Sequence, residues 1–257
     1  MTARRILAGA LALAVIAAGW GAGVPATRAA HTEDATLPDL VMLPPSDFKI
    51  EQQARKTRLL RFSTVIVNLG PGPFQVLGQL NGATSGDPYD VVQHLAEPGG
   101  GLSDHPTGAT MFWSGDGHNH FHVRDLQEMT LQNLNALVLA RGAKRGFCFW
   151  DNYNYGAPAP AYYHPSTTDA CELAPDGTVP MGLSVRWGDR YPYNIAFQYI
   201  DISKLGNGEY LVTVAADPAA PGETGQFIEA NEQNNTAWAR IRINRKSVTV
   251  LATSGLP

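Results

Sequence analysis

Residues 59–78 read LLRFSTVIVNLGPGPFQVLG, and the interpretation of the whole chain starts from this pattern. Residues 59–69 alternate and are rich in β-branched side chains, which favours a β-strand. GPGP at 70–73 ends that strand, because proline has no backbone N–H to donate to a sheet and glycine adopts turn conformations readily. Apolar residues resume at Phe74. The stretch therefore predicts one strand, a turn and a second strand.

Similar composition recurs along the chain and predicts an all-β fold. Residues 79–108 are rich in Gly, Asp, Ser and Pro, and residues 152–181 are aromatic and turn-rich, so both are expected to be long loops. No segment shows a long apolar period of 3.6 residues, so little helix is expected. The predicted fold is a β-sandwich-like domain with long loops. Further strand-like segments lie at 120–134, 136–151, 184–203, 209–217 and 237–243.

The first 29 residues have the three-part pattern of a secretory signal peptide. Arg4 and Arg5 precede an apolar run rich in alanine and glycine, and small residues up to Ala29 offer a cleavage site. The alternative for this run is a membrane anchor, and the arginine pair leaves open whether export uses the general or the twin-arginine route. No other apolar run is long enough to span a bilayer. We therefore expect a secreted or cell-envelope protein without a membrane span after residues 1–29 are removed.

Charge limits the classes of partner. Removing the predicted signal takes away three arginines and no acidic residue, which leaves 16 basic and 23 acidic side chains and a net charge of −7. A surface of this sign argues against nucleic acid and fits cationic partners.

Cys148 and Cys171 are the two cysteines of the chain. In an exported protein an even number of cysteines predicts a disulfide, and the alternative is a pair of buried thiols. A bridge closing a loop of this size would contribute about 3 kcal/mol on the chain-entropy model.

The segment GDGHNHFHV (115–123) places His118, His120 and His122 at alternate positions. On a strand, alternate side chains project from one face. The outer pair would be about 13 Å apart on a straight strand, so binding of a single ion requires the backbone to curl. Three imidazoles without thiolate or carboxylate suit copper or zinc. The pattern predicts a metal site, and a zinc hydrolase with a metal-bound water remains open beside a copper protein.

The segment HNHFHVRDL resembles the copper-binding segment of lysyl oxidases, in which an acidic residue, here Asp125, follows the histidines. Other motifs occur in the order of that family's catalytic domain, so the resemblance covers residues 37–243. It implies that residues 30–257 form a lysyl oxidase-like catalytic domain. The motifs are LPDLV, LLRF, KRGFCFWD, GLS followed by DRY, QYIDIS, GxYLVxV and ExNExNN.

This resemblance implies a copper-dependent amine oxidase with a lysyl tyrosylquinone cofactor. By position in the motifs, the quinone would form from Lys144 and Tyr191. The expected substrate is a primary amine, such as a lysine side chain of a peptide or protein. Molecular oxygen would oxidise the amine to an aldehyde, with release of ammonia and hydrogen peroxide. Asp189, two residues before Tyr191, is the candidate general base.

The motif ExNExNN adds a candidate calcium site, since oxygen ligands suit calcium. Asn231 stands where the family often has aspartate, and the loss of one negative charge should weaken the site. The alternative is a turn capped by asparagine without an ion. The ligands implied by the resemblance are Asp39 (carboxylate), Leu40 (backbone carbonyl), Glu229, Asn231, Asn234 and Asn235.

The chain also departs from animal lysyl oxidases. It is much poorer in cysteine and has Gly117 beside the histidines where the family has a cysteine, which indicates a bacterial relative. A second hypothesis is therefore a non-catalytic extracellular β-sandwich module that binds copper or calcium and has lost the quinone.

Overall fold

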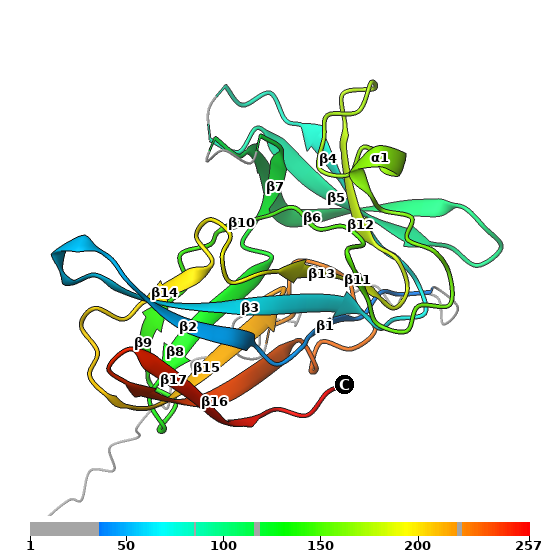
Figure 1. The fold of residues 1–257 in the computed structure, drawn as a ribbon. Coiled ribbons are helices and arrows are strands. Elements are labelled where there is room, and N and C mark those ends of the chain that lie inside the picture. Colours follow the sequence, from blue (N-terminus) through cyan, green and yellow to red (C-terminus); the bar gives the residue numbers. More distant parts are fainter. Residues whose placement is uncertain (1–35, 85, 116–118, 220–222) are drawn as a thin grey trace, which may run out of the picture. The chain divides into compact units, whose positions relative to one another are not determined.

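The computed structural model describes residues 36–84, 86–115, 119–219 and 223–257 (Figure 1). The predicted signal peptide, Gly117 and His118 lie outside these ranges. Within them the all-β prediction is confirmed, because strands β1 to β17 account for most of the regular structure. The described helices are the 3₁₀ turn η1 (Ala54–Lys56) and the short helix α1 (Pro165–Thr168). No helix of the described part is long and apolar enough to cross a membrane.

The first sheet is built around the long strand β3, which begins at Arg58 within the stretch predicted to be a strand. Antiparallel pairing places Thr64 of β3 opposite Tyr191 and Ile66 opposite Asp189. This pairing brings the C-terminal half of the chain against its N-terminal half. The strands of this sheet are β1 (Leu40–Met42), β2 (Ser46–Gln52), β3 (Arg58–Asn68), β11 (Tyr153–Asn154), β13 (Trp187–Tyr191) and β14 (Tyr199–Asp201).

The turn after β3 leads into a different sheet. The predicted strand, turn and strand are present, but β3 and β4 do not pair with each other. The turn is tightly packed: a Cβ on Gly72 would lie 1.9 Å from the carbonyl oxygen of Thr36, so only glycine fits. The second sheet contains, in order, β10 (Gly146–Phe147), β7 (Phe121–Arg124), β6 (Leu102–Trp113), β5 (Tyr89–Ala96), β4 (Phe74–Leu80) and β12 (Val179–Leu183).

The third sheet carries the C-terminal strands. Its alternating burial, with Ala239, Ile241 and Ile243 buried and the residues between them exposed, is the period-2 pattern of a sheet with one face on the core. The strands are, in order, β17 (Ser247–Thr253), β16 (Thr236–Asn244), β15 (Gly208–Ala216), β8 (Gln127–Gln132) and β9 (Val138–Arg141).

The expected loop at 79–108 is wrong, because the end of β4, all of β5 and the first part of β6 lie within it. Gly99–Gly101, with positive φ, form the turn between β5 and β6, whereas Asp90, Asp104 and Pro106 lie within these strands. Strand β5 buries Val91 and Leu95 and pairs on both sides, with β4 and β6. Backbone pairing with neighbouring strands therefore outweighs the local turn propensity.

One buried cluster joins the sheets. It includes Phe62 of the first sheet, Met111 of the second and Val212 of the third, each with no exposed surface. Truncating a buried phenylalanine such as Phe62 to alanine costs about 3–5 kcal/mol in folding free energy. The three sheets therefore share one core.

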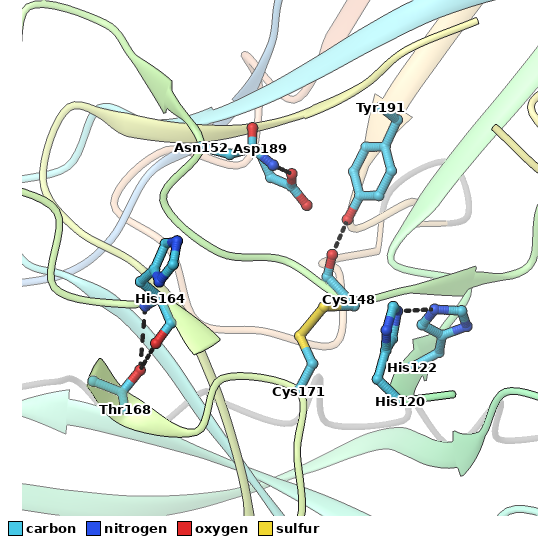
Figure 2. The surroundings of a disulfide bond; sticks show 9 residues. All are labelled: His120, His122, Cys148, Asn152, His164, Thr168, Cys171, Asp189 and Tyr191. Atoms are coloured by element: carbon cyan, nitrogen blue, oxygen red, sulfur yellow. Dashed lines mark hydrogen bonds between the residues drawn. A yellow bond between two sulfur atoms is a disulfide. The ribbon is translucent and has the colours of Figure 1, made fainter. Parts of the chain in front are cut away.

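The predicted disulfide is confirmed. Cys148 and Cys171 are bonded, with their Cα atoms 5.7 Å apart. The bridge fastens the segment after β10 to the irregular segment between α1 and β12 (Figure 2).

Candidate active site

Two of the three motif histidines converge on one point. His122 is buried on β7, and His120 lies just before that strand. Their Nε2 atoms are 3.0 Å apart, and their ring centroids are 4.8 Å apart (Figure 2). Asn119, immediately upstream, has φ of 51°, a left-handed conformation that asparagine tolerates. The backbone therefore turns where the histidine spacing required it to curl.

This convergence fits a shared metal ion. Two imidazole nitrogens bound to one ion at about 2.0–2.1 Å would lie about 3 Å apart when the angle at the metal is close to a right angle. Copper and zinc both accept imidazole ligands. His118, the third member of the motif, lies outside the described residues.

The histidine segment is held by its neighbours in space. The N–H of Phe121, between the two histidines, donates to the carbonyl of Cys171 at 2.9 Å. Across the strand pair, a Cβ on Gly146 would lie 2.5 Å from Nδ1 of His122 and 2.7 Å from the ring of Phe112. Gly146 therefore provides the space for the His122 ring. Sequence reasoning missed this role, although its signal was present as the glycine of KRGFC.

The predicted quinone pair lies together. Lys144 and Tyr191 are both buried, and Nζ of Lys144 is 5.2 Å from the centroid of the Tyr191 ring. The same Nζ is 5.3 Å from the centroid of Phe147, whose ring meets Tyr191 edge to face. These are cation–π distances. Residues 47 positions apart in sequence are thus in contact range before any covalent bond joins them.

Tyr191 is fixed through its hydroxyl. The O–H donates to the backbone carbonyl of Cys148 at 2.8 Å, at the end of the ring that faces the disulfide (Figure 2). Burial raises the pKa of the Tyr191 phenol well above its ordinary value, and the neighbouring Asp189 carboxylate adds to this effect. The phenol is therefore protonated at neutral pH in the metal-free protein.

Asp189 lies on the same buried face of β13 as Tyr191, because alternate residues of a strand point to one side, and it is 1% exposed. Burial raises the pKa of its carboxyl to about 7, although Tyr191, Asn152 and Lys144 lower it in part. The Asn152 amide donates to Oδ1, and Oδ2 has no donor among the described residues. A carboxyl with a pKa near neutrality and one unoccupied oxygen can both take up and release a proton.

These groups line a single cavity of about 150 Å³. Trp150 and Ile195 form an apolar wall of this cavity, while its polar groups come from three separate parts of the chain. The structure thus brings together the described residues that the sequence singled out for chemistry: His120, His122, Lys144, Asp189 and Tyr191.

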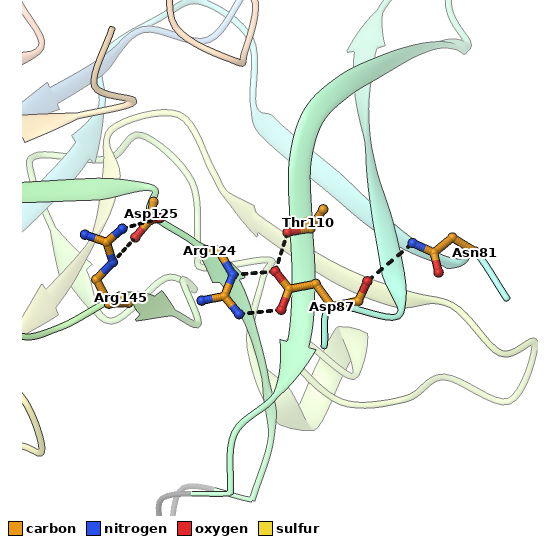
Figure 3. Close-up of polar contacts among 6 residues, drawn as sticks. All are labelled: Asn81, Asp87, Thr110, Arg124, Asp125 and Arg145. Carbon is orange, nitrogen blue, oxygen red and sulfur yellow. Dashed lines mark hydrogen bonds and ion pairs between the residues drawn. The ribbon is translucent and has the colours of Figure 1, made fainter. Parts of the chain in front are cut away.

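Two ion pairs hold the strands beside Lys144. The acidic residue of the histidine motif, Asp125, forms a two-pronged pair with Arg145, with Nε 2.7 Å from Oδ1 and Nη2 2.8 Å from Oδ2 (Figure 3). Arg124 forms a second two-pronged pair with Asp87. The ion pair between Asp125 and Arg145 therefore restrains the segment that carries Lys144.

The candidate calcium residues are partly assembled. The Asn234 amide donates to Asp39 at 3.1 Å, and the Asn235 amide donates to Glu229 at 3.0 Å. Three buried oxygens lack a donor among the described residues, one each on Asp39, Asn234 and Asn235. Burial raises the pKa of Glu229 to about 9 and also raises the pKa of Asp39. Such oxygens fit a hard cation.

Two members of the implied calcium set are placed differently. Leu40 presents its backbone N–H to the Glu229 carboxylate. Asn231 is exposed, and its side-chain oxygen accepts from the N–H of Gln233 at 3.1 Å. The structure therefore does not bring the Asn231 side chain toward the other oxygens.

Comparison with known proteins bears on this arrangement. The family model described as lysyl oxidase matches residues 102–253, more than half of the chain. The chain belongs to the lysyl oxidase family. The site residues lie within the matched range, so the candidate site of this lysyl oxidase-family chain is part of what the family model covers; they are His120, His122, Lys144, Asp189 and Tyr191.

Individual relatives agree with the family. The chain is 24% identical over 192 residues to lysyl oxidase homolog 4 of Mus musculus, which is 74% of this chain and 19% of that protein. It is 29% identical over 128 residues to lysyl oxidase homolog 2 of Homo sapiens, which is 49% of this chain and 14% of that protein. The similar region of this lysyl oxidase-family chain thus corresponds to a fifth or less of the length of the curated relatives it matches.

Proposed function

We propose that this lysyl oxidase-family chain is a copper- and quinone-dependent amine oxidase that converts primary amines to aldehydes with molecular oxygen. The observation that carries the proposal is the position of Lys144 Nζ over the ring of Tyr191, in the same cavity as His120 and His122. Family membership supports an amine oxidase-type oxidoreductase. Ammonia and hydrogen peroxide are the other expected products.

Copper would be held by His120 and His122, whose Nε2 atoms converge, together with His118 of the same motif. When bound, copper and oxygen would supply oxidation of a phenol to a quinone, and the quinone would supply the carbonyl that accepts electrons from an amine. Tyr191 would be the phenol, because its ring lies in the cavity and its hydroxyl is fixed by Cys148.

Lys144 would donate the amine that bonds to the Tyr191 ring. It needs little rearrangement to do so, since Nζ already lies 5.2 Å from the ring centroid. The ion pair between Arg145 and Asp125 restrains the backbone next to Lys144. Holding the two reactants in place removes part of the entropic cost of joining them.

Asp189 would be the general base that takes a proton from the carbon beside the substrate nitrogen. A base with a pKa near the working pH is most effective, and the pKa of Asp189 is about 7. Its free Oδ2 lies beside the tyrosine from which the quinone would form. Trp150 and Ile195 would exclude water from the alkyl part of the amine.

The substrate class follows from charge and from the predicted export. A net charge of −7 for the chain without residues 1–29 favours cationic partners, and lysine side chains of secreted or cell-envelope proteins match that description. Calcium, held by Asp39, Glu229, Asn234 and Asn235, would stabilise the fold away from the catalytic cavity. Leu40 and Asn231 complete the set implied by the family motif.

The first test is peptide mapping by mass spectrometry after the full chain is loaded with copper in air. We expect a covalent link between the Lys144 and Tyr191 peptides. The chain contains a matched internal control: Lys49 lies 4.2 Å from the ring centroid of Tyr193, but Lys49 is exposed and neither residue lines the cavity with the histidines. No link should form between Lys49 and Tyr193. A link there, or none at Lys144, contradicts the proposal.

The second test is peroxide release from a lysine-containing peptide. Wild-type protein and Lys49→Arg should release peroxide, whereas Lys144→Arg should release none above background. Copper binding without cross-link and without peroxide would instead identify the chain as a non-catalytic metal-binding module. Hydrolysis of an ester or amide substrate by the zinc-loaded protein would favour a hydrolase.

A further inference from the structure

Trp150 is the largest side chain in the wall of the candidate cavity. It lines the same space of about 150 Å³ as Asp189 and Tyr191. The side chain is partly buried and packs against the main hydrophobic core. Small-molecule pockets usually enclose roughly 300–1,000 Å³, so this cavity is small. In a cavity of this size, the shape of one bulky wall residue decides which substrates fit.

The ring of Trp150 is held by His164. The two ring centroids are 4.7 Å apart, and the rings meet edge to face, an arrangement that aromatic pairs prefer. His164 is itself fixed at the start of α1, where its Nδ1 accepts the N–H of Ser166 at 3.2 Å. The hydroxyl of Thr168 donates to the His164 carbonyl at 3.3 Å (Figure 2). The Trp150 ring therefore rests on a side chain that is already in place.

The backbone of Trp150 is held by the next residue, Asp151, which is 3% exposed. The carboxylate accepts the backbone N–H groups of Tyr162, Tyr163 and Ser184 and the Ser184 hydroxyl, at 2.6–3.1 Å. A carboxylate only accepts hydrogen bonds, so it suits a set made only of donors. The N–H of Asp151 donates in turn to the Tyr163 carbonyl at 2.8 Å. Asp151 thus fastens the segment that carries Trp150 to two other parts of the chain.

The cavity has an apolar side and a polar side. Trp150 and Ile195 form the apolar side, and the carboxyl group of Asp189 lies on the polar side, where the Asn152 amide donates to it. An alkylammonium ion has the same division, with a charged end and an apolar chain. A straight chain can lie along the Trp150 ring, whereas an aromatic ring next to the amino group would need the space that Trp150 occupies.

We propose that Trp150 is the specificity-determining residue of this site and restricts it to unbranched alkyl amines. The inference rests on the proposed amine oxidase function and narrows its substrate class. His164 and Asp151 are positioning residues, because they act through Trp150. A lysine side chain fits this class, and arylalkyl amines such as benzylamine do not.

The first test is equilibrium binding of n-butylamine and benzylamine to the copper-free full chain, measured by ligand-detected NMR. n-Butylamine has the carbon chain of a lysine side chain. We expect the wild type to bind n-butylamine about tenfold or more tightly than benzylamine. Trp150→Ala should bring the two affinities within about threefold of each other, because the benzyl ring can take the space of the indole.

Two further variants keep the test decisive if Trp150→Ala does not fold. Trp150→Phe keeps a smaller ring and should lower the selectivity by about threefold. His164→Ala removes the edge-to-face contact and should lower it by a similar factor of about three. The control is Trp238→Ala, which removes a tryptophan of β16 that does not line the cavity, and its selectivity should equal that of the wild type.

The second test is peroxide release from the two amines by copper-loaded protein, with each rate divided by the amount of cross-linked protein found by mass spectrometry. The ratio of kcat/KM for n-butylamine to that for benzylamine should fall by about tenfold in Trp150→Ala. No binding of n-butylamine by the wild type, wild-type selectivity in the Trp150 variants, or an equal loss in Trp238→Ala would overturn the role of Trp150. Selective binding that depends on Trp150, without peroxide from either amine, would support that role and contradict the oxidase proposal.

Discussion

The hydroxyl of Tyr191 donates a 2.8 Å hydrogen bond to the backbone carbonyl of Cys148, whose sulfur is bonded to Cys171. The carbonyl of Cys171 in turn accepts the N–H of Phe121, between His120 and His122. The disulfide therefore connects the tyrosine of the proposed cofactor with the strand of the proposed copper ligands.

Removing the bridge should lower both stability and the yield of cross-link. For Cys148→Ser with Cys171→Ser, we expect a loss of about 3 kcal/mol in unfolding free energy, because the unfolded chain is no longer restrained. The melting temperature should fall by about 6–12 °C, measured by calorimetry without copper. An unchanged melting temperature would show that the bridge adds nothing to the fold.

Gly146→Ala should weaken copper binding. The added Cβ would lie 2.5 Å from Nδ1 of His122, so the ring must move away from His120. We expect copper affinity, measured by competition with a chelator, to fall by about tenfold or more. Gly206→Ala is the control, since a Cβ there would meet nothing within 4 Å. Equal affinities in both variants would refute the role of Gly146.

Amine oxidation should depend on the charge state of Asp189. The pKa of this carboxyl is about 7, and only the carboxylate can accept a proton, so kcat/KM should rise as pH increases through 7. Asn152→Ala removes a donor that favours the carboxylate, and the midpoint should move up by about one pH unit. Asn154→Ala, whose side chain accepts from Gly156 instead, should leave the midpoint unchanged. A common midpoint for all three proteins would exclude Asp189 as the base.

The calcium-free protein should lose stability as pH rises. Burial raises the pKa of Glu229 to about 9 in the folded state, from 4.5 in the unfolded state. The folded protein therefore holds a proton that the unfolded chain releases, and this contribution is complete below pH 4.5 and lost as pH rises through 9. Melting temperatures in EDTA should fall across this window. Glu229→Gln should flatten the curve, and a slope equal to that of the wild type would contradict the argument.

Several features were predictable from local sequence. Alternation and β-branched residues predicted β3 and the turn after it, and the two cysteines of an exported chain predicted the bridge. The HxHxH spacing predicted that neighbouring imidazoles converge, because alternate residues of a strand share a face. The strand, the turn and the histidine pattern depend on residues that are close together in the chain. The disulfide could be predicted because two cysteines allow only one pairing.

Other features came only from the tertiary structure. The composition of residues 79–108 predicted a loop, but β5 forms there because it pairs with both β4 and β6. It also gave no sign that β3 and β4 enter different sheets. The resemblance named Lys144 and Tyr191, but it could not say that their side chains lie together in the unlinked protein. Non-local backbone pairing decides these points.

The sequence by itself determined the elements: strand periods, the turn at 70–73, the bridge partners and the histidine triplet. The tertiary structure alone decided the distances, because sheet register places Tyr191 opposite Thr64 and within reach of Lys144. It also decided the pKa values of buried carboxyl groups, since those of Asp189 and Glu229 are raised only when folding removes water from them. Local patterns follow from side-chain chemistry, whereas burial and long-range contacts belong to the whole fold.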